Sequence, residues 1–209
     1  MRFRAVVILA ALVTAGVACE KGNPLRSQNG QPSGSFTFTP GGPALAGATE
    51  VAFSASATDP DGDALSYAWD FGDGATGSGQ NVRHVFDTTG ALNVVLTVQD
   101  GKSGSVTSSK SVEVRSLTGR WIDIDPRFRV DLVQNGRTFT GSVTVAGFGQ
   151  VSTINAGILR DPRDVAFHRQ SSVPGFATVD YRGSLDATLN HMNVVAIQNA
   201  ATSFNLTRE

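Results

Sequence analysis

The sequence predicts an all-β protein, in which a β-sandwich is followed by a small antiparallel up-and-down β-barrel or a second sandwich. Val, Thr and Phe recur at alternate positions in many short segments, and Gly accounts for 23 of the 209 residues. Alternation with a period of two places successive side chains on opposite faces of a strand. Beyond residues 1–34, the remaining length suits two small domains rather than one large domain.

Residues 1–18 have the layout of a secretory signal peptide. Arg2 and Arg4 form a basic start, residues 5–13 form an apolar run, and small residues lead from there to Cys19. The apolar run is shorter than the roughly 20 residues that an ordinary membrane-spanning helix needs. We therefore expect this segment to be removed on export.

Cys19 is the only cysteine, so neither an internal disulfide nor a zinc-binding cysteine cluster can form. The sequence Gly16-Val17-Ala18-Cys19 resembles the lipobox of bacterial lipoproteins, with Gly16 at a position where Leu is usual. The resemblance implies that diacylglycerol is attached to the thiol and that the acyl chains anchor the protein in a bilayer. The alternative is ordinary cleavage near Ala18, which leaves a free thiol.

The lipobox resemblance also implies a location in the cell envelope. Glu20 follows the cysteine, and the Asp that retains many bacterial lipoproteins at the inner membrane is absent. The resemblance therefore implies the outer membrane, where the organism has one. The following residues are polar and rich in Gly, Pro, Ser and Asn, so residues 19–34 are expected to be the lipidated cysteine and a flexible tether.

Residues 35–115 contain about seven short alternating segments separated by Gly, Pro and Asp, a pattern typical of a sandwich. Within them, residues 69–74 have the sequence Trp-Asp-Phe-Gly-Asp-Gly, and Val82, His84 and Phe86 precede an alternating strand at 92–98. This two-part motif resembles the signature of PKD domains. The resemblance implies an immunoglobulin-like sandwich that makes protein or polysaccharide contacts in surface proteins and secreted hydrolases.

The motif residues have predictable structural roles. Trp69 and Phe71 alternate on one strand and are expected to fill the core. Because glycine tolerates unusual backbone angles, a sharp turn can follow them, and short carboxylates can accept hydrogen bonds from its amides. The structural motif comprises Trp69, Asp70, Phe71, Gly72, Asp73, Gly74 and His84. His84 is expected to be a hydrogen-bonded structural residue rather than a catalytic base.

Residues 117–209 contain eight candidate strands joined by short links, and Asn135-Gly136 is a favoured hairpin sequence. Eight sequential strands can close into an up-and-down barrel; an open two-sheet sandwich is the alternative. Gly-x-Trp at the start and Phe-x-Leu at the end resemble those of small lipocalin-like barrels. The alternating residues that mark the strands after the first are Phe128, Val130, Leu132, Phe139, Gly141, Val143, Val145, Ile154, Ala156, Ile158, Val165, Phe167, Val179, Tyr181, Leu185, Val195, Ile197, Phe204 and Leu206.

An acidic run precedes the Trp69 strand. Asp59, Asp61 and Asp63 alternate around a glycine turn and offer the oxygen ligands that Ca²⁺ prefers, with Asp70 or Asp73 as further ligands. The alternative is a solvated acidic turn. We expect no required cofactor, and calcium is the one ion that the sequence suggests.

The remaining residues favour binding over catalysis. The chain has no nucleophile elbow and no phosphate-binding loop, and neither His168 nor His191 has a metal-ligand partner at a diagnostic spacing. The 17 basic and 18 acidic residues form no basic stripe, which argues against nucleic acid. We expect a non-enzymatic, membrane-anchored binding or structural module that contacts the bilayer through Cys19 and a protein or polysaccharide through its domains. The alternative is a carrier of a small apolar ligand inside the barrel.

Overall fold

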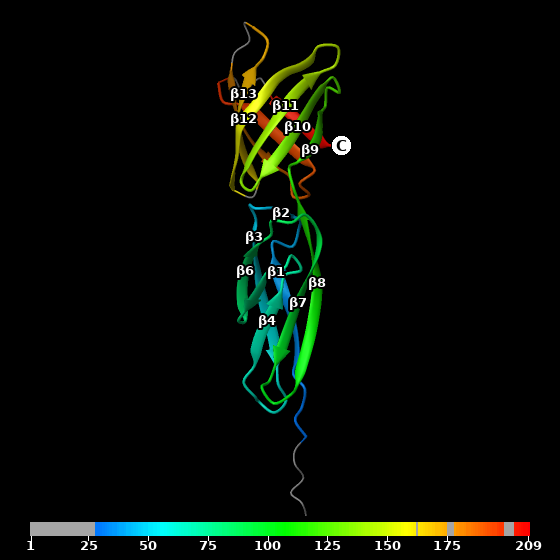
Figure 1. The fold of residues 1–209 in the computed structure, drawn as a ribbon, viewed down its shortest axis with the longest axis vertical. Helices are drawn as coiled ribbons and strands as arrows, with labels where there is room; N and C mark the ends of the chain where they lie inside the picture. The colour runs from blue at the N-terminus through cyan, green and yellow to red at the C-terminus, as the bar shows by residue number, and fades with distance from the viewer. Residues whose placement is uncertain (1–27, 162, 175–177, 199–202) are drawn as a thin grey trace, which may run out of the picture.

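A computed structural model describes residues 28–161, 163–174, 178–198 and 203–209. All regular elements in this part are β-strands, which confirms the predicted fold class. The strands form two domains placed end to end, with residue 28 and the barrel at opposite ends (Figure 1). The predicted signal peptide and Cys19 lie outside the described residues. No helix in the described ranges has the length and apolarity needed to cross a membrane.

The first domain is a sandwich of two sheets, with the strand orders β1-β3-β6 and β2-β8-β7-β4-β5. Its strands are β1 (Ser33–Thr39), β2 (Ala44–Leu45), β3 (Glu50–Thr58), β4 (Ser66–Asp70), β5 (Thr76–Ser78), β6 (Asn81–Val85), β7 (Gly90–Gln99) and β8 (Ser105–Arg115). All pairs are antiparallel except β2 with β8. The alternation predicted from the sequence holds here, because one face of each long strand is buried between the sheets.

Aromatic side chains fill the centre of this sandwich. The Phe53 ring lies 5.6 Å from both the Trp69 and the Phe71 rings, measured between centroids, and Phe36 packs edge-on against Trp69 at 5.1 Å. All four side chains are 2% exposed. Trp69 Nε1 donates a 2.8 Å hydrogen bond to the carbonyl of Gly79, so the one polar atom of this indole is satisfied inside the core.

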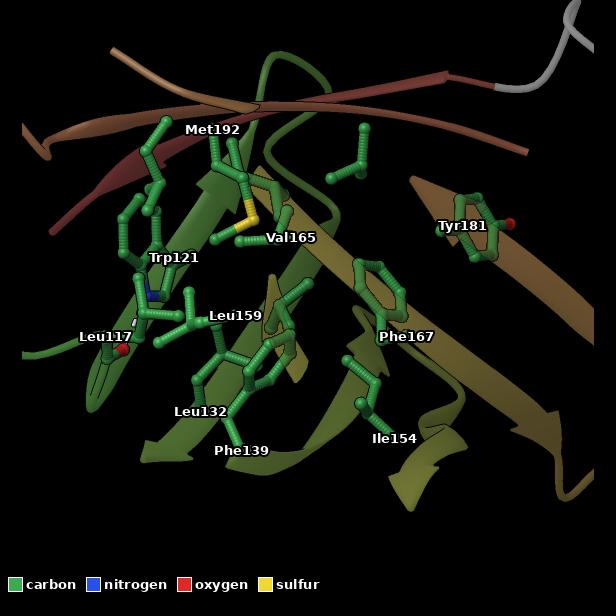
Figure 2. Close-up of a cluster of buried hydrophobic side chains, with 14 of the residues drawn as sticks. Leu117, Trp121, Leu132, Phe139, Ile154, Leu159, Val165, Phe167, Tyr181 and Met192 are labelled. Atoms are coloured by element: carbon green, nitrogen blue, oxygen red, sulfur yellow. Dashed lines mark hydrogen bonds between the residues drawn. The ribbon is translucent and has the colours of Figure 1, made fainter. Parts of the chain in front are cut away.

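The second domain is a closed eight-stranded barrel with the order β10-β11-β12-β13-β14-β15-β16-β9. Its strands are β9 (Gly119–Asp123), β10 (Phe128–Asn135), β11 (Thr138–Val145), β12 (Gly149–Asp161), β13 (Asp164–Ser171), β14 (Val179–Leu185), β15 (His191–Ala196) and β16 (Ser203–Arg208). Pairing of β9 with β16 closes it, so the open-sandwich alternative is not adopted. Trp121, Phe139 and Tyr181 are among the large side chains buried inside (Figure 2).

Two barrel strands differ from the alternation predicted for them. Register shifts on β12 between Ile154 and Ile158 reverse the phase, so Ile154 faces the core while Ala156 and Ile158 are exposed. On β15 the buried side chains are Met192, Val194 and Ala196, whereas Ile197 is 56% exposed. Both predictions were wrong by one residue. A bulge inserts an unpaired residue on β12, whereas on β15 the exposed polar residues His191 and Asn193 alternate with the buried side chains and mark a phase that the prediction did not follow.

The two domains share one hydrophobic cluster at their junction. Leu45 and Ala48 of the sandwich, together with Leu117 of the connection, pack into the core cluster of the barrel. The backbones of Gly47 and Gly136 lie so close that a Cβ on Gly47 would be 2.7 Å from Gly136 Cα. Hence the barrel contacts the sandwich through the hairpin predicted at Asn135-Gly136.

Hydrogen bonds reinforce this junction. Gln134 Nε2 donates to the carbonyl of Ala46 at 2.7 Å, and Gln134 Oε1 accepts from the amide of Leu117 at 2.6 Å. Arg115 Nη1 donates to the carbonyl of Thr188 at 2.6 Å and to Asn190 Oδ1 at 2.8 Å. The domains are therefore joined by buried packing and by polar contacts on both sides of the connection.

Candidate functional site

The acidic loop between β3 and β4 brings three carboxylates together. Each of Asp59, Asp61 and Asp63 offers an oxygen, and these atoms lie within 4.8 Å of one another. Asp59 Oδ1 accepts hydrogen bonds from the amides of Asp61 and Asp63, at 2.9 and 3.1 Å. Gly62, with φ of 76°, lets the loop close tightly. The spacing seen in the sequence therefore gathers the carboxylates because the loop folds around the first of them.

The remaining oxygens of this loop have different surroundings. Asp59 Oδ2 and Asp63 Oδ2 are buried and have no hydrogen-bond partner among the described residues. Asp63 Oδ1 is 2.6 Å from the ammonium nitrogen of Lys102. Asp61 Oδ2 accepts a 2.6 Å hydrogen bond from the amide of Gly30. Two carboxylate oxygens thus remain without a donor, next to one ammonium group.

A second turn places Lys102 beside the acidic loop. Asp100, which is 4% exposed, accepts hydrogen bonds from the amides of Lys102 and Gly104, at 2.6 and 2.9 Å, and from the Asn29 side chain at 2.7 Å. The hydrogen bond to Asp63 raises the pKa of Lys102. Sequence reasoning missed Lys102 and Asn29, which are about 40 and 30 residues from the loop; the Asp100-Gly101 turn signal was the only local hint.

Asp70 and Asp73 do not join this cluster. Each accepts a hydrogen bond from the amide two residues further on: Gly72 N to Asp70 Oδ1 at 2.8 Å, and Ala75 N to Asp73 Oδ1 at 3.0 Å. Asp73 is also paired with His84, 2.7 Å from Oδ2 to Nε2. The cluster of three carboxylates contains neither residue. Their hydrogen bonds are used within the turn and across the sandwich.

The barrel lumen is filled. The cavity among its side chains has a volume of about 20 Å³, whereas pockets for small ligands usually measure about 300–1,000 Å³. Phe139, Phe167 and Phe204 line the cavity, and Phe167 stacks on Tyr181 with centroids 5.1 Å apart. Gly141 leaves no free space, because a Cβ there would be 2.5 Å from the carbonyl oxygen of Asp131. The lumen therefore provides no room for the apolar ligand of the carrier alternative.

An open cleft of about 560 Å³ lies where the domains meet. Pro43 and Glu50 line it from the sandwich, and Asp161, Arg163 and Leu189 line it from the barrel. Glu50 is paired with Arg83. The cleft is open to solvent and lined by both apolar and charged side chains, and among the described residues it holds no group of His, Cys, Asp or Glu gathered as closely as that of the acidic loop.

Comparison with known proteins identifies the first domain. Residues 39–115 match the family described as PKD domain. This segment is a PKD domain. The PKD1 domain of Vibrio anguillarum Epp is 31% identical, with 42% of this chain and all of that chain covered and a TM-score of 0.34. The predicted PKD resemblance is thereby confirmed.

The similar curated proteins are collagenases much longer than this chain. Collagenase ColQ1 of Bacillus cereus is 32% identical over 106 residues, which are 49% of this chain and 11% of that protein. Collagenase ColA of Clostridium perfringens is 41% identical over 56 residues, 27% of this chain and 5% of that protein. The chain therefore covers about a tenth or less of each. A structure of carbohydrate-binding modules from the β-sandwich superfamily is 18% identical over 87% of this chain and 86% of that chain, with a TM-score of 0.41.

Proposed function

We propose that this protein is a lipid-anchored module of the cell envelope, in which the PKD domain holds the barrel away from the anchoring membrane and contacts a protein or polysaccharide. The observation that carries the proposal is the junction, where Leu45 and Leu117 are buried in the barrel cluster and Arg115 binds the loop at 188–190. Because the connection is packed and hydrogen-bonded, it fixes the orientation of one domain relative to the other. The start of the described chain, before β1, and the barrel lie at opposite ends (Figure 1), which supports a spacer role for the PKD domain.

The outer faces of the PKD sheets support a contact with a polar polymer. On the β1–β3 face, exposed hydroxyl side chains lie opposite one another in the pairs Ser33–Thr58, Ser35–Ser56 and Thr37–Ser54. On β8 the exposed residues include Ser105, Thr107, Ser109 and Ser111. Hydroxyl groups both donate and accept hydrogen bonds, and these short side chains lose little entropy when they are ordered. Such hydroxyl-rich faces suit extended glycan or protein chains.

Calcium binding at the acidic loop is part of the proposal. Ca²⁺ takes oxygen ligands, and Asp59 Oδ2 and Asp63 Oδ2 are buried oxygens without a donor among the described residues. The residues therefore fit the ion, which would supply the positive charge that Lys102 supplies now. Because Gly30 and Asn29 contact this loop and its neighbour, bound calcium would also fasten the end of the tether.

The anchor is tested by exchanging Cys19 for Ser in the source bacterium or an expressing host. We expect the wild-type chain in the membrane fraction, with a mass raised by acyl chains, and the variant without that added mass. An unmodified wild-type chain in the soluble fraction would refute the anchor while leaving the domain proposal open.

Partner contact is tested with the chain from residue 20, which keeps every contact described above. Co-sedimentation with fibrillar collagen and with insoluble polysaccharides covers both partner classes, and collagen is included because of the collagenase matches. Thr37→Glu with Ser56→Glu alters one PKD face, and Thr107→Glu with Ser109→Glu alters the other. We expect one pair to abolish binding and the other, as matched control, to leave it intact. Binding by both variants at the wild-type level would exclude the two PKD faces as the contact surface.

A further inference from the structure

The end of the barrel that points away from the PKD domain carries exposed apolar side chains. In an up-and-down barrel alternate loops lie at the same end, so the β9–β10, β11–β12, β13–β14 and β15–β16 connections share the distal end (Figure 1). In the part of these four connections that the structure describes, each contributes one large apolar residue that is exposed: Ile124 at 84%, Phe148 at 82%, Val173 at 38% and Ile197 at 56%. We call these four residues the distal tip.

This concentration is specific to the tip. Elsewhere on the described barrel surface, the exposed large apolar residues are Val133, at 60%, and Ile158, at 45%. Val133 lies on the side of β10 and Ile158 on the side of β12. Single exposed apolar residues are normal on a protein surface, whereas a group at one end marks an interaction site.

The tip is also electrically neutral. The described connecting residues 146–148, 172–174 and 197–198 contain no charged side chain. The fourth connection, 124–127, holds one acid and one arginine, Asp125 and Arg127, and the other charged side chains near the distal end are Asp123, Asp180, Arg129 and Arg169. Arg127 is bound to Asp125, with 2.6 Å between Nη2 and Oδ2. A partner of this surface is therefore selected by its apolar character and not by net charge.

We propose that the distal tip inserts into the surface of a phospholipid bilayer. Ile124 and Phe148, each more than four-fifths exposed, protrude from separate loops, so the tip presents separate apolar projections. A bilayer adapts to such a shape, whereas a rigid protein partner would need a matching hollow for each side chain. The exposed Arg127 and Arg129 lie next to the tip, where long basic side chains reach the headgroups while apolar neighbours insert. Since the proposed function keeps the barrel away from the anchoring membrane, the bilayer that the tip enters is a different one, and the inference does not depend on the lipid anchor at Cys19.

The first test is co-sedimentation of the chain from residue 20 with phosphatidylcholine vesicles. We expect the binding to be unchanged between about 50 and about 500 mM NaCl and not to increase when phosphatidylglycerol is added, because salt screens interactions between charges and the tip has no net charge. Ile124→Ser with Phe148→Ser is expected to lower the partition coefficient about tenfold or more. Val133→Ser with Ile158→Ser is the matched control and should bind as the wild type does.

A fluorescent variant separates insertion from loss of fold. Both native tryptophans are buried, Trp69 at 2% and Trp121 at 0% exposure, so Phe148→Trp adds the one exposed indole among the described residues. Its emission should shift to shorter wavelength with vesicles, and brominated lipids should quench it, while Val133→Trp should show neither change. Absence of wild-type binding, equal loss in the control pair, or binding only to anionic vesicles at low salt would overturn the proposal. Self-association through the tip without vesicle binding would overturn it in favour of a protein partner.

Discussion

Nε2 of His84 lies 2.7 Å from Oδ2 of Asp73, and this contact joins the two sheets of the PKD domain. His84 belongs to β6 in one sheet, and Asp73 follows β4 of the other. The imidazole also stacks on Phe71, with ring centroids 4.1 Å apart and 6° between the planes. The side chains of His84 and Asp73 are only 18% and 7% exposed. The two halves of the PKD motif are thus adjacent in space, although about ten residues separate them in sequence.

This contact predicts a stability that depends on pH. Burial alone would raise the pKa of Asp73, but hydrogen bonds from His84 and from the amide of Ala75 hold this pKa below the ordinary value of an aspartate. A carboxyl whose pKa is lower in the folded protein than in the unfolded chain stabilises the fold fully when the pH is above its unfolded-state pKa. This stabilisation is lost as the pH falls through the folded-state pKa. We expect Asp73→Asn to flatten the loss of stability below about pH 4.

Replacement of His84 by Ala tests the same contact at neutral pH. We expect the free energy of unfolding to fall by about 1–3 kcal/mol, because Asp73 loses a partner and Phe71 loses its stacked ring. Urea unfolding measures the change, and His168→Ala, at an exposed histidine on the barrel, is the control. Unchanged stability in His84→Ala would show that the contact does not hold the sheets together.

Removal of Lys102 should strengthen calcium binding at the acidic loop. The ammonium group of Lys102 is 2.6 Å from Asp63 Oδ1, so it competes with a cation for the same carboxylate. In millimolar Ca²⁺ we expect the wild-type melting temperature to rise by about 2–4 °C. The rise should be larger in Lys102→Gln and absent in Asp59→Asn with Asp63→Asn. Identical melting with calcium and with a chelator in all three proteins would exclude a calcium site.

Leu117→Ala should weaken both domains at once. Leu117 is completely buried in the shared cluster, and its carbonyl accepts the indole hydrogen of Trp121 at 3.0 Å. Truncation of a buried leucine costs about 2–5 kcal/mol. Calorimetry should show one transition that moves down as a whole, whereas Val133→Ala, at an exposed position, should change little. Two transitions, of which only the barrel transition moves, would mean that the domains unfold independently.

Gly157→Ala tests the packing of the lumen. Gly157 is buried on β12, and a Cβ there would overlap the ring of Phe139, which is itself 2% exposed and surrounded by core residues. Overpacking of this kind costs about 1–3 kcal/mol. Thermal unfolding of this variant, compared with Ala156→Ser at the exposed neighbouring position, measures the effect. Equal stability of the two variants would indicate a lumen that adapts more easily than the packing suggests.

The sequence was a better guide to the PKD domain than to the barrel. On β3 and β7 the period of two is uninterrupted, and residues such as Phe53 and Leu96 lie on the predicted inner face. On β12 the phase depends on a bulge that the apolar pattern does not mark, which is why Ile158 was assigned to the wrong face. Local alternation predicts a strand, whereas its inward face depends on pairing with neighbours that are distant in sequence.

The same limit applies to the acidic loop and the junction. The spacing of Asp59, Asp61 and Asp63 is local, so their clustering could be anticipated from a few residues. Lys102 reaches the loop through a different turn, and Leu45 meets Leu117 across more than 70 residues. Neither partnership leaves a periodic signal, because each depends on the three-dimensional arrangement of complete domains.

Closure of the barrel by β9 and β16 determines when that domain can fold. Trp121 pairs in register with Arg208, so β9 finds its second neighbour only when β16, the last barrel strand, is present. Contacts between residues so far apart in sequence slow folding, because a long loop must close before they form. The PKD domain can complete its strand pairings earlier, and the apolar side chain of Leu45 then stays exposed to solvent until the barrel has folded. A chain truncated within β16 could not close the barrel. Its folded PKD domain would keep this apolar surface exposed, and the chain would be prone to aggregation.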